Sequence, residues 1–225
     1  MTSVESHSRK RVVVFISGGG SNMLTLAKAC EAPEWPAEIT CVISDKASAG
    51  GLAKAEALGI PTKVFERKAF ASKAEHEEAI LAALDEIGPD IICLAGYMRL
   101  LSADFIRRHK GNILNIHPSL LPLFPGLHTH QRAIDAGMKI AGCTVHFVTE
   151  GMDEGPIVAQ AAVPVLAQDT AETLATRILT VEHQLYPLAL KLVAEDKVRM
   201  EDGRAVTTPG AATALAEQTL ISGGV

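Results

Sequence analysis

Aromatic residues are scarce in this chain of 225 residues, and long apolar runs are missing. Phe, Trp and Tyr make up 4% of the sequence, too few to predict the stacking platforms that hold single-stranded nucleic acid. The net charge of −5 and the lack of a basic block argue against a phosphate backbone as ligand. No apolar stretch reaches the length of a membrane span. Neither nucleic acid nor a membrane is therefore expected as a partner.

Cysteine pairs are also missing. The four cysteines are scattered and form no CxxC motif, which disfavours a zinc ribbon or a redox motif. Cys41, Cys93 and Cys143 lie in strand-like apolar contexts, where a thiol usually acts as a small buried hydrophobe. This usage is typical of a reducing compartment. Residues 1–10 lack the apolar core of a signal peptide, so we expect a cytoplasmic protein.

The pattern of apolar residues predicts the fold. Strand-like runs occur at residues 11–16, 38–45, 62–66, 90–96 and 111–116, with helical patterns between them. Ser72 and Glu75 form a capping-box pattern that opens the longest of these helices. This alternation is typical of an α/β fold with a doubly wound, mostly parallel, Rossmann-like sheet. Such sheets bind ligands at the carboxyl ends of their strands, beside the point where strand order reverses.

The pattern changes after residue 130. Two longer strands are predicted over 141–149 and 155–165, joined by the turn EGMDE. A hairpin there would add antiparallel strands at the sheet edge. A long helix over 170–195 follows, and Pro187 inside it should kink or interrupt it.

These segments predict one domain with two extensions. We place the domain at residues 11–204, a disordered extension at 1–10 and a partly disordered tail at 205–225, where small and polar residues dominate.

The segment SGGGSN, residues 17–22, follows the first predicted strand. It could be only a tight turn between strand and helix, where glycine is common. Alternatively it cradles a phosphate, with backbone N–H groups meeting the anion at a helix N-terminus and Ser21 and Asn22 adding donors. It lacks the lysine of a P-loop and the spacing of a dinucleotide fingerprint. Its place at a strand end favours the anion site.

Asn115 and His117 lie in the segment LNIHPSLLPLFPGLHTH and end the fifth predicted strand. The period of a strand puts both side chains on one face, which can point into the crevice. A hydrogen-bonded core histidine is one alternative. A metal site that recruits His128 and His130 is another, but no HExxH or similar motif accompanies it, so no metal is expected.

Several charged or polar residues are ambiguous by themselves. Asp153 lies in the turn EGMDEG, where Asp is common for local reasons, and it matters only if its loop folds over His117. Lys73 and Arg99 would ordinarily be solvated charges. His146, inside a strand, is interpreted as structural or as support behind the site.

Five segments together resemble one family: VVVFISGGGSN, AGYMRLLS, ILNIHPSLLPLFPGLHTH, TVHFVTEGMDEGPIVAQ and EHQLYP. They are similar to the phosphoribosylglycinamide formyltransferases of purine synthesis, colinearly from about Arg11 to about Met200. NIHPSLLP is shared with other enzymes that use 10-formyltetrahydrofolate, whereas the first loop and PGLHTH point to the glycinamide ribonucleotide enzymes. Two departures are Gly19, where relatives often have Asn, and Lys73, where several have Arg and its bidentate fork.

The resemblance implies transfer of a formyl group from the co-substrate 10-formyltetrahydrofolate to the amine of N1-(5-phospho-D-ribosyl)glycinamide. It implies a catalytic trio of Asn115, His117 and Asp153. It assigns Gly20, Ser21 and Asn22 to the phosphate, Glu182 to the ribose or glycinamide end, and Lys73, Met98, Arg99, Leu100, Leu101 and Asn115 to the folate. It leaves a homodimer open.

Other functions stay open beside this one. A formyltetrahydrofolate hydrolase (deformylase) is similar around NIHPS but usually carries an N-terminal regulatory domain, and about ten residues precede the first strand here. A methionyl-tRNA formyltransferase would usually carry a further tRNA-binding domain. A non-catalytic nucleotide-binding module explains the glycine loop but leaves Asn115, His117 and Asp153 without a role.

Overall fold

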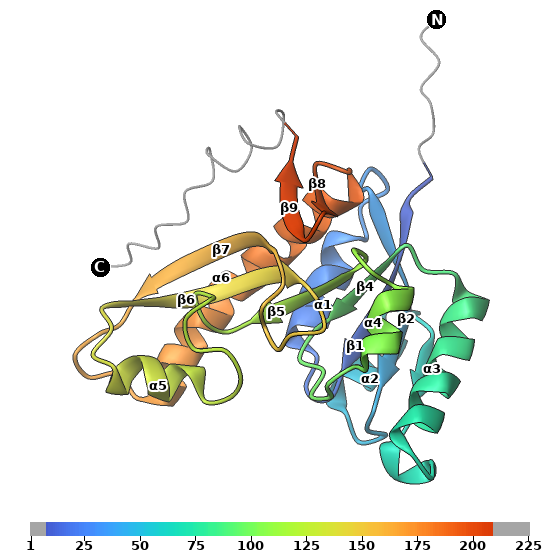
Figure 1. Ribbon diagram of the computed structural model, residues 1–225, viewed down its shortest axis with the longest axis horizontal. Coiled ribbons are helices and arrows are strands. Elements are labelled where there is room, and N and C mark those ends of the chain that lie inside the picture. Colours follow the sequence, from blue (N-terminus) through green and yellow to red (C-terminus); the bar gives the residue numbers. More distant parts are fainter. Residues whose placement is uncertain (1–7, 209–225) are drawn as a thin grey trace, which may run out of the picture.

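A computed structural model describes residues 8–208, which form one seven-stranded sheet covered by helices and followed by a small hairpin (Figure 1). The sheet has the order β3-β2-β1-β4-β5-β6-β7. Its strands are β1 (Lys10–Ile16), β2 (Ala37–Ser44), β3 (Thr62–Val64), β4 (Ile91–Leu94), β5 (Ile113–His117), β6 (Ile140–Phe147) and β7 (Ile157–Pro164). The first five pair in parallel, whereas β6 and β7 run antiparallel at one edge. The predicted fold class and the edge hairpin are confirmed.

Helices cover both faces of the sheet, which explains the uninterrupted apolar run of β1 (Figure 1). One core contains side chains of α1 (Ser21–Ala29), α2 (Gly50–Ala57), α5 (Thr129–Asp135) and α6 (Ala171–Ala194). The opposite core contains side chains of α3 (Lys73–Ile87) and α4 (Ala103–Arg108), with a short 3₁₀ helix, η1 (Arg67–Ala69), before α3. As predicted, Ser72 caps α3, because its hydroxyl accepts the N–H of Glu75 at 3.1 Å.

The structure differs from two sequence predictions in the C-terminal part. Helix α6 continues through Pro187 without interruption. Leu185, Tyr186 and Leu190 beside it are almost fully buried, and this packing outweighs the roughly 3 kcal/mol that an interior proline costs. A hairpin of β8 (Val198–Glu201) and β9 (Arg204–Thr207) was not predicted.

The expected tail therefore begins inside β9, and the rest of it, residues 209–225, lies outside the described residues, as do residues 1–7. Within residues 8–208, no helix combines the length and the apolar character needed to cross a membrane.

Two loops meet where the order of the strands reverses, between β1 and β4. Ser17, directly after β1, donates its backbone N–H to the Gly96 carbonyl at 3.2 Å. Its hydroxyl accepts the N–H of Met98 at 2.8 Å. Because ligands of open α/β sheets bind at such a reversal point, these loops position the candidate site.

Candidate active site

Asn115 and His117 lie at the carboxyl end of β5, as the sequence predicts. Asn115 lies opposite Leu94 of β4 and His146 of β6, and His117 lies opposite Thr144. Asn115 is half-buried and His117 is buried. The side chains therefore lie at the carboxyl edge of the parallel sheet, next to the loops that follow β1 and β4.

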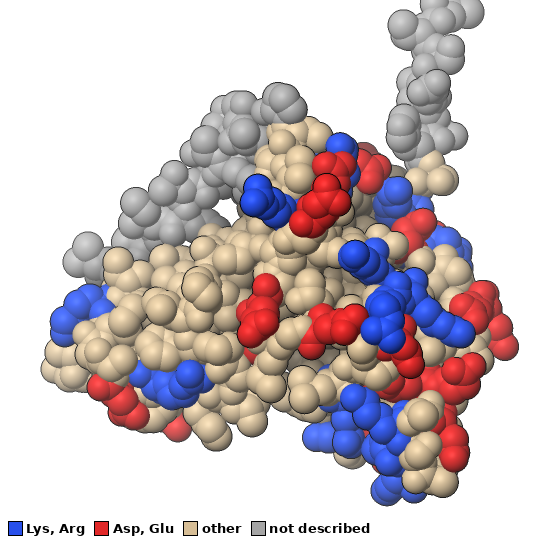
Figure 2. Space-filling view, viewed as in Figure 1, with Lys and Arg blue, Asp and Glu red and all other residues tan. Residues whose placement is uncertain are grey.

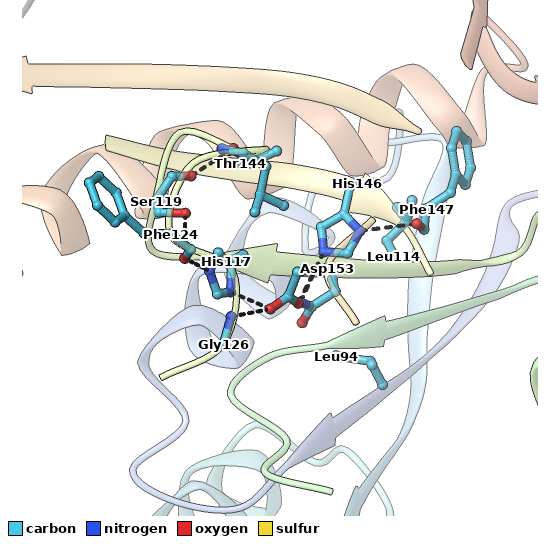
Figure 3. Close-up of polar contacts among 12 residues, drawn as sticks. Leu94, Leu114, His117, Ser119, Phe124, Gly126, Thr144, His146, Phe147 and Asp153 are labelled. Atoms are coloured by element: carbon cyan, nitrogen blue, oxygen red, sulfur yellow. Dashed lines mark hydrogen bonds and ion pairs between the residues drawn. The ribbon is translucent and has the colours of Figure 1, made fainter. Parts of the chain in front are cut away.

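The loop between β6 and β7 folds back over His117 (Figure 3). Asp153 Oδ2 accepts the backbone N–H of Gly126 at 2.8 Å and lies 3.4 Å from His117 Nδ1. Asp153 has a left-handed backbone with φ of 55°, a conformation that Asp tolerates better than most residues. Asp153 thus meets the condition on which its functional interpretation depended.

Both ring nitrogens of His117 face hydrogen-bond acceptors (Figure 3). His117 Nε2 lies 3.0 Å from the carbonyl oxygen of Phe124, and Nδ1 faces the Asp153 carboxylate. A carbonyl oxygen can only accept, so His117 Nε2 carries the proton in its contact with Phe124. Phe124 has a left-handed φ of 54°, which costs an aromatic residue roughly 1–3 kcal/mol. Contacts around this loop must maintain that conformation.

His146 determines how Asn115 is oriented. His146 Nδ1 donates to the carbonyl of Phe147 at 3.0 Å, so Nε2 is left as an acceptor for Asn115 Nδ2 at 3.2 Å. Burial lowers the pKa of His146, although the Phe147 carbonyl and Asp153 act in the opposite direction. The neutral ring therefore fixes the Asn115 amide, and no contact within residues 8–208 occupies its second N–H. This agrees with the interpretation of His146 as support.

Tyr186 of α6 connects the ends of β4 and β5 from beneath the sheet. Its hydroxyl lies 3.0 Å from the carbonyl oxygen of Leu94 and 3.2 Å from that of Leu114. The side chain is completely buried. Because Leu114 precedes Asn115, this contact holds the strand end that carries the polar side chains.

Two adjoining hollows lie beside these residues. The inner hollow, of about 500 Å³, is lined at one end by Asn115, His146 and Asp153. The outer hollow, of about 280 Å³, is lined by Arg67, Lys73, His76, Glu77, Tyr97, Met98, Arg99, Leu100 and Leu101. Lys73, Tyr97, Arg99, Leu100 and Leu101 line both. The residues that the sequence assigned to the folate are therefore grouped here.

These hollows lie in the more highly charged half of the molecule. Figure 2 shows Lys, Arg, Asp and Glu gathered over α3 and α4, whereas the surface over β6 and β7 carries few charges on this face. Met98 and Leu100 are 68% and 66% exposed. The loop after β4 thus presents apolar side chains and cations to solvent at the same place.

The glycine loop has a backbone that a side chain would disrupt. Gly20 has φ of +67°, and a Cβ atom there would lie 2.7 Å from the Cα of Gly51 at the start of α2. Asn22 Nδ2 donates to Glu182 Oε2 at 2.7 Å. Burial raises the pKa of Glu182, although the bond from Asn22 lowers it. The four residues assigned to the ribonucleotide therefore meet, with the Asn22 amide already engaged.

The histidines considered as metal ligands do not gather with other ligands. Within the part of the chain that the structure describes, no three His, Cys, Asp or Glu side chains form a group that could hold a metal ion. His128 is exposed and precedes α5, and burial lowers the pKa of His130.

Several residues around the site were not singled out from the sequence, among them Ser17, Asp45, Phe124 and Tyr186. Asp45 Oδ2 lies 2.7 Å from Arg99 Nε. One signal was present for Ser17 and Asp45, since each is a polar residue at the end of a predicted apolar strand. Phe124 acts through its backbone carbonyl, and the Tyr186 hydroxyl contacts the carbonyls of Leu94 and Leu114, so no side-chain pattern records these contacts.

Comparison with known proteins places the chain among formyl transferases. The family model described as "Formyl transferase" matches residues 10–190. The solved structure of phosphoribosylglycinamide formyltransferase from Brucella melitensis is 70% identical, with a TM-score of 0.80, over 89% of this chain and 100% of that one. The trifunctional purine biosynthetic protein adenosine-3 of Bos taurus is 49% identical over 87% of this chain, which spans about a fifth of that relative.

A formyltetrahydrofolate deformylase is also similar in structure. The enzyme from Pseudomonas syringae pv. tomato str. DC3000 is 29% identical, with a TM-score of 0.82, over 88% of this chain and 66% of that one. This deformylase is less similar to the chain in sequence than the transferase of Brucella melitensis, and a larger part of it has no counterpart in this chain.

Proposed function

Because the chain belongs to the formyl transferase family, we propose that it transfers a formyl group from 10-formyltetrahydrofolate to the amine of N1-(5-phospho-D-ribosyl)glycinamide in purine synthesis. The observation that carries this proposal is the group formed by Asn115, His117 and Asp153 at the end of β5, beside the inner hollow. The 70% identity to a phosphoribosylglycinamide formyltransferase supports the same substrates.

The chemistry needs positive charge or N–H donors at the formyl oxygen. The substrate amine attacks the formyl carbon, a C–N bond forms, and negative charge grows on that oxygen until the bond to the folate nitrogen breaks. The free N–H of Asn115 and a protonated His117 stabilise this charge. The Asp153 carboxylate, 3.4 Å from Nδ1, and the Phe124 carbonyl oxygen, 3.0 Å from Nε2, would stabilise a positive charge that forms on the ring.

One proton must move during the transfer. The attacking amine loses a proton, and the folate nitrogen leaves with one, so the two changes balance. His117 and Asp153 can relay that proton, directly or through ordered water. The formyl group is already activated on the folate, so this route needs neither a metal nor a covalent intermediate with the protein.

Different loops bind the two substrates. The backbone N–H groups of Gly20, Ser21 and Asn22 hold the phosphate at the start of α1, and Glu182 meets the ribose or glycinamide end. Met98, Leu100 and Leu101 line the folate site together with Asn115, and backbone groups of this loop read the pterin. Lys73 and Arg99 face the carboxylates of the folate's glutamate tail.

The deformylase activity is the second candidate, supported by the similarity to the Pseudomonas syringae enzyme. Incubation with radiolabelled formyl donor, with and without the ribonucleotide, decides between the two. The proposal expects label on the glycinamide product and little free formate. Formate release that is independent of the ribonucleotide would favour the deformylase, and no reaction with either acceptor would favour a non-catalytic binding module.

The cysteines support the proposed surroundings of the enzyme. All four are free and buried, which supports a reducing, cytoplasmic setting. The negative net charge favours small-molecule substrates over nucleic acid. Light scattering after size-exclusion chromatography decides between a monomer and the homodimer that the sequence leaves open.

A further inference from the structure

Asp45 contacts Arg99 in the proposed donor site, although its own side chain lines neither hollow. It follows β2 directly, and its side chain is 1% exposed. Oδ2 lies 2.7 Å from Arg99 Nε, whereas Oδ1 is buried and has no hydrogen-bond partner among the residues that the structure describes. A buried carboxylate with one unsatisfied oxygen is costly. Its presence therefore calls for a role beyond packing.

Arg99 connects Asp45 to the hollows, where a ligand can bind. Its side chain lines both hollows and is 44% exposed. Asp45 engages Nε, which carries one of the five guanidinium N–H groups. The four N–H groups on the two Nη atoms remain for a ligand. A guanidinium fixed in this way suits a carboxylate, because two parallel hydrogen bonds can form.

The other cationic side chains of the outer hollow, Lys73 and Arg67, are not held by a buried carboxylate in the same way as Arg99. Lys73 Nζ lies 3.6 Å from Glu77 Oε1, and the Glu77 side chain is 8% exposed. That carboxylate is also occupied by the Ser102 N–H at 2.9 Å. Arg67 instead donates to the carbonyl of Phe70. Among the described contacts of this hollow, the Asp45–Arg99 pair thus joins the most buried acid to a partly exposed arginine at short distance.

We propose that Asp45 is a positioning residue that aims Arg99 at the carboxylates of the formyl donor's glutamate tail, and so sets how strongly the enzyme prefers donors that carry one. The proposal rests on the proposed function, since it assumes a folate donor. It extends the donor site to β2, a strand that otherwise does not contribute to it.

The test compares two donors with the same reacting end. One is 10-formyltetrahydrofolate, and the other is 10-formyltetrahydropteroate, which lacks the glutamate. For Asp45→Ala we expect KM for the folate donor to rise roughly tenfold, the scale of one charge-assisted hydrogen bond, with kcat within about twofold. KM for the pteroate donor stays as in the wild type. Asp45→Asn, which retains an oxygen for Nε, gives a smaller rise.

Two further variants make the result specific. Arg99→Met should give the same loss for the folate donor, and adding Asp45→Ala to it should cause no further loss, because both residues act as one unit. Asp90→Asn is the matched control: Asp90 also accepts a hydrogen bond, from the Arg11 N–H, but it precedes β4 at the opposite end of the sheet. It should leave KM unchanged for both donors.

Several outcomes overturn the inference. An equal rise in KM for both donors would make Asp45 only a support of the loop. A lower KM for the folate donor would mean that Asp45 masks Arg99 instead of aiming it. Equal KM values of the two donors in the wild type would exclude a tail preference altogether. If Asp45→Ala does not fold, Asp45→Asn and the Arg99 variants carry the test. Failure of the proposed function is separate, because the wild type would then transfer no formyl group.

Discussion

The two sides of the site are built by different means. On the proposed acceptor side, the glycine loop after β1 presents backbone groups, and Gly20 and Gly51 approach so closely that neither has room for a side chain. On the proposed donor side, the loop after β4 presents side chains, among them the exposed Met98 and Leu100 and the half-exposed Arg99. A small rigid phosphate suits fixed amides, whereas a long flexible folate suits adaptable apolar side chains and cations.

This contrast teaches where each side is vulnerable. Backbone recognition fails when the chain path changes, so almost any substitution at Gly20 should be harmful. Side-chain recognition is spread over several residues, so single changes should be graded. The two sides meet at β5, where the proposed mechanism places His117 at the reacting atoms.

The largest effect is expected at that meeting point. His117→Ala should lower kcat by roughly 10²–10³, because it removes a charged donor from the developing oxyanion, and should leave both KM values almost unchanged. Steady-state kinetics with each substrate varied in turn measures this. An unchanged kcat with an intact thermal transition would remove His117 from the mechanism.

The next largest effect is expected for Gly20→Val. The added Cβ atom would meet Gly51 at 2.7 Å, and the φ of +67° disfavours any side chain. KM for the ribonucleotide should rise roughly 10- to 100-fold, the worth of one or two hydrogen bonds to a charged group, with folate binding retained. Gly88→Val is the control, since Gly88 has a similar φ of +63° and open space around it. Equal weakening of both ligands would show that the loop supports the fold generally.

Asn22→Ala tests a buried side-chain pair on the proposed acceptor side. It should lower the free energy of unfolding by roughly 1–3 kcal/mol, because Glu182 loses its hydrogen bond. Burial already raises the pKa of Glu182 above its ordinary 4.5, so the folded state binds the extra proton and stability falls as pH rises through that window. Losing the Asn22 bond raises this pKa further.

The stability loss should therefore be greater at pH 8 than at pH 5 in urea unfolding. Glu182→Gln serves as the control and should remove this component of the pH dependence. Stability losses that are equal at both pH values would mean that the Asn22 bond does not influence the protonation of Glu182.

The smallest effect is expected for Ser17→Ala. This substitution should affect both sides of the site. Ser17 follows β1 but accepts the N–H of Met98 in the donor loop. We expect both KM values to rise roughly two- to tenfold, the worth of one neutral hydrogen bond, as measured by varying each substrate in turn. A change confined to one substrate would show that the two loops are independent.

The sequence predicted the parts of this molecule that repeat a local rule. Alternating apolar runs predicted the sheet and its helices, and the period of a strand placed Asn115 and His117 on one face. The β8–β9 hairpin also has a local signal in the sequence, the dipeptide Asp202-Gly203, which is typical of a two-residue hairpin turn. The structure gives these residues the φ values of 47° and 74° that such a turn requires.

The remaining features depend on residues far apart in the chain. Asp45 meets Arg99 across 54 positions, and no periodicity links them. The carbonyl of Phe124 faces His117 only because Phe124 has a left-handed backbone, a conformation that its residue type does not predict. The continuity of α6 through Pro187 depends on packing against the sheet, which outweighs local preference.

The contact of Tyr186 with β4 and β5 has a consequence for synthesis. A ribosome makes the chain from its N-terminus, so Leu94 and Leu114 emerge 92 and 72 residues before the tyrosine that joins them. Until α6 docks, the underside of the sheet is an open apolar surface and the end of β5 lacks its clamp. We therefore expect substrate-binding competence to arise late, after nearly all of the domain has been translated.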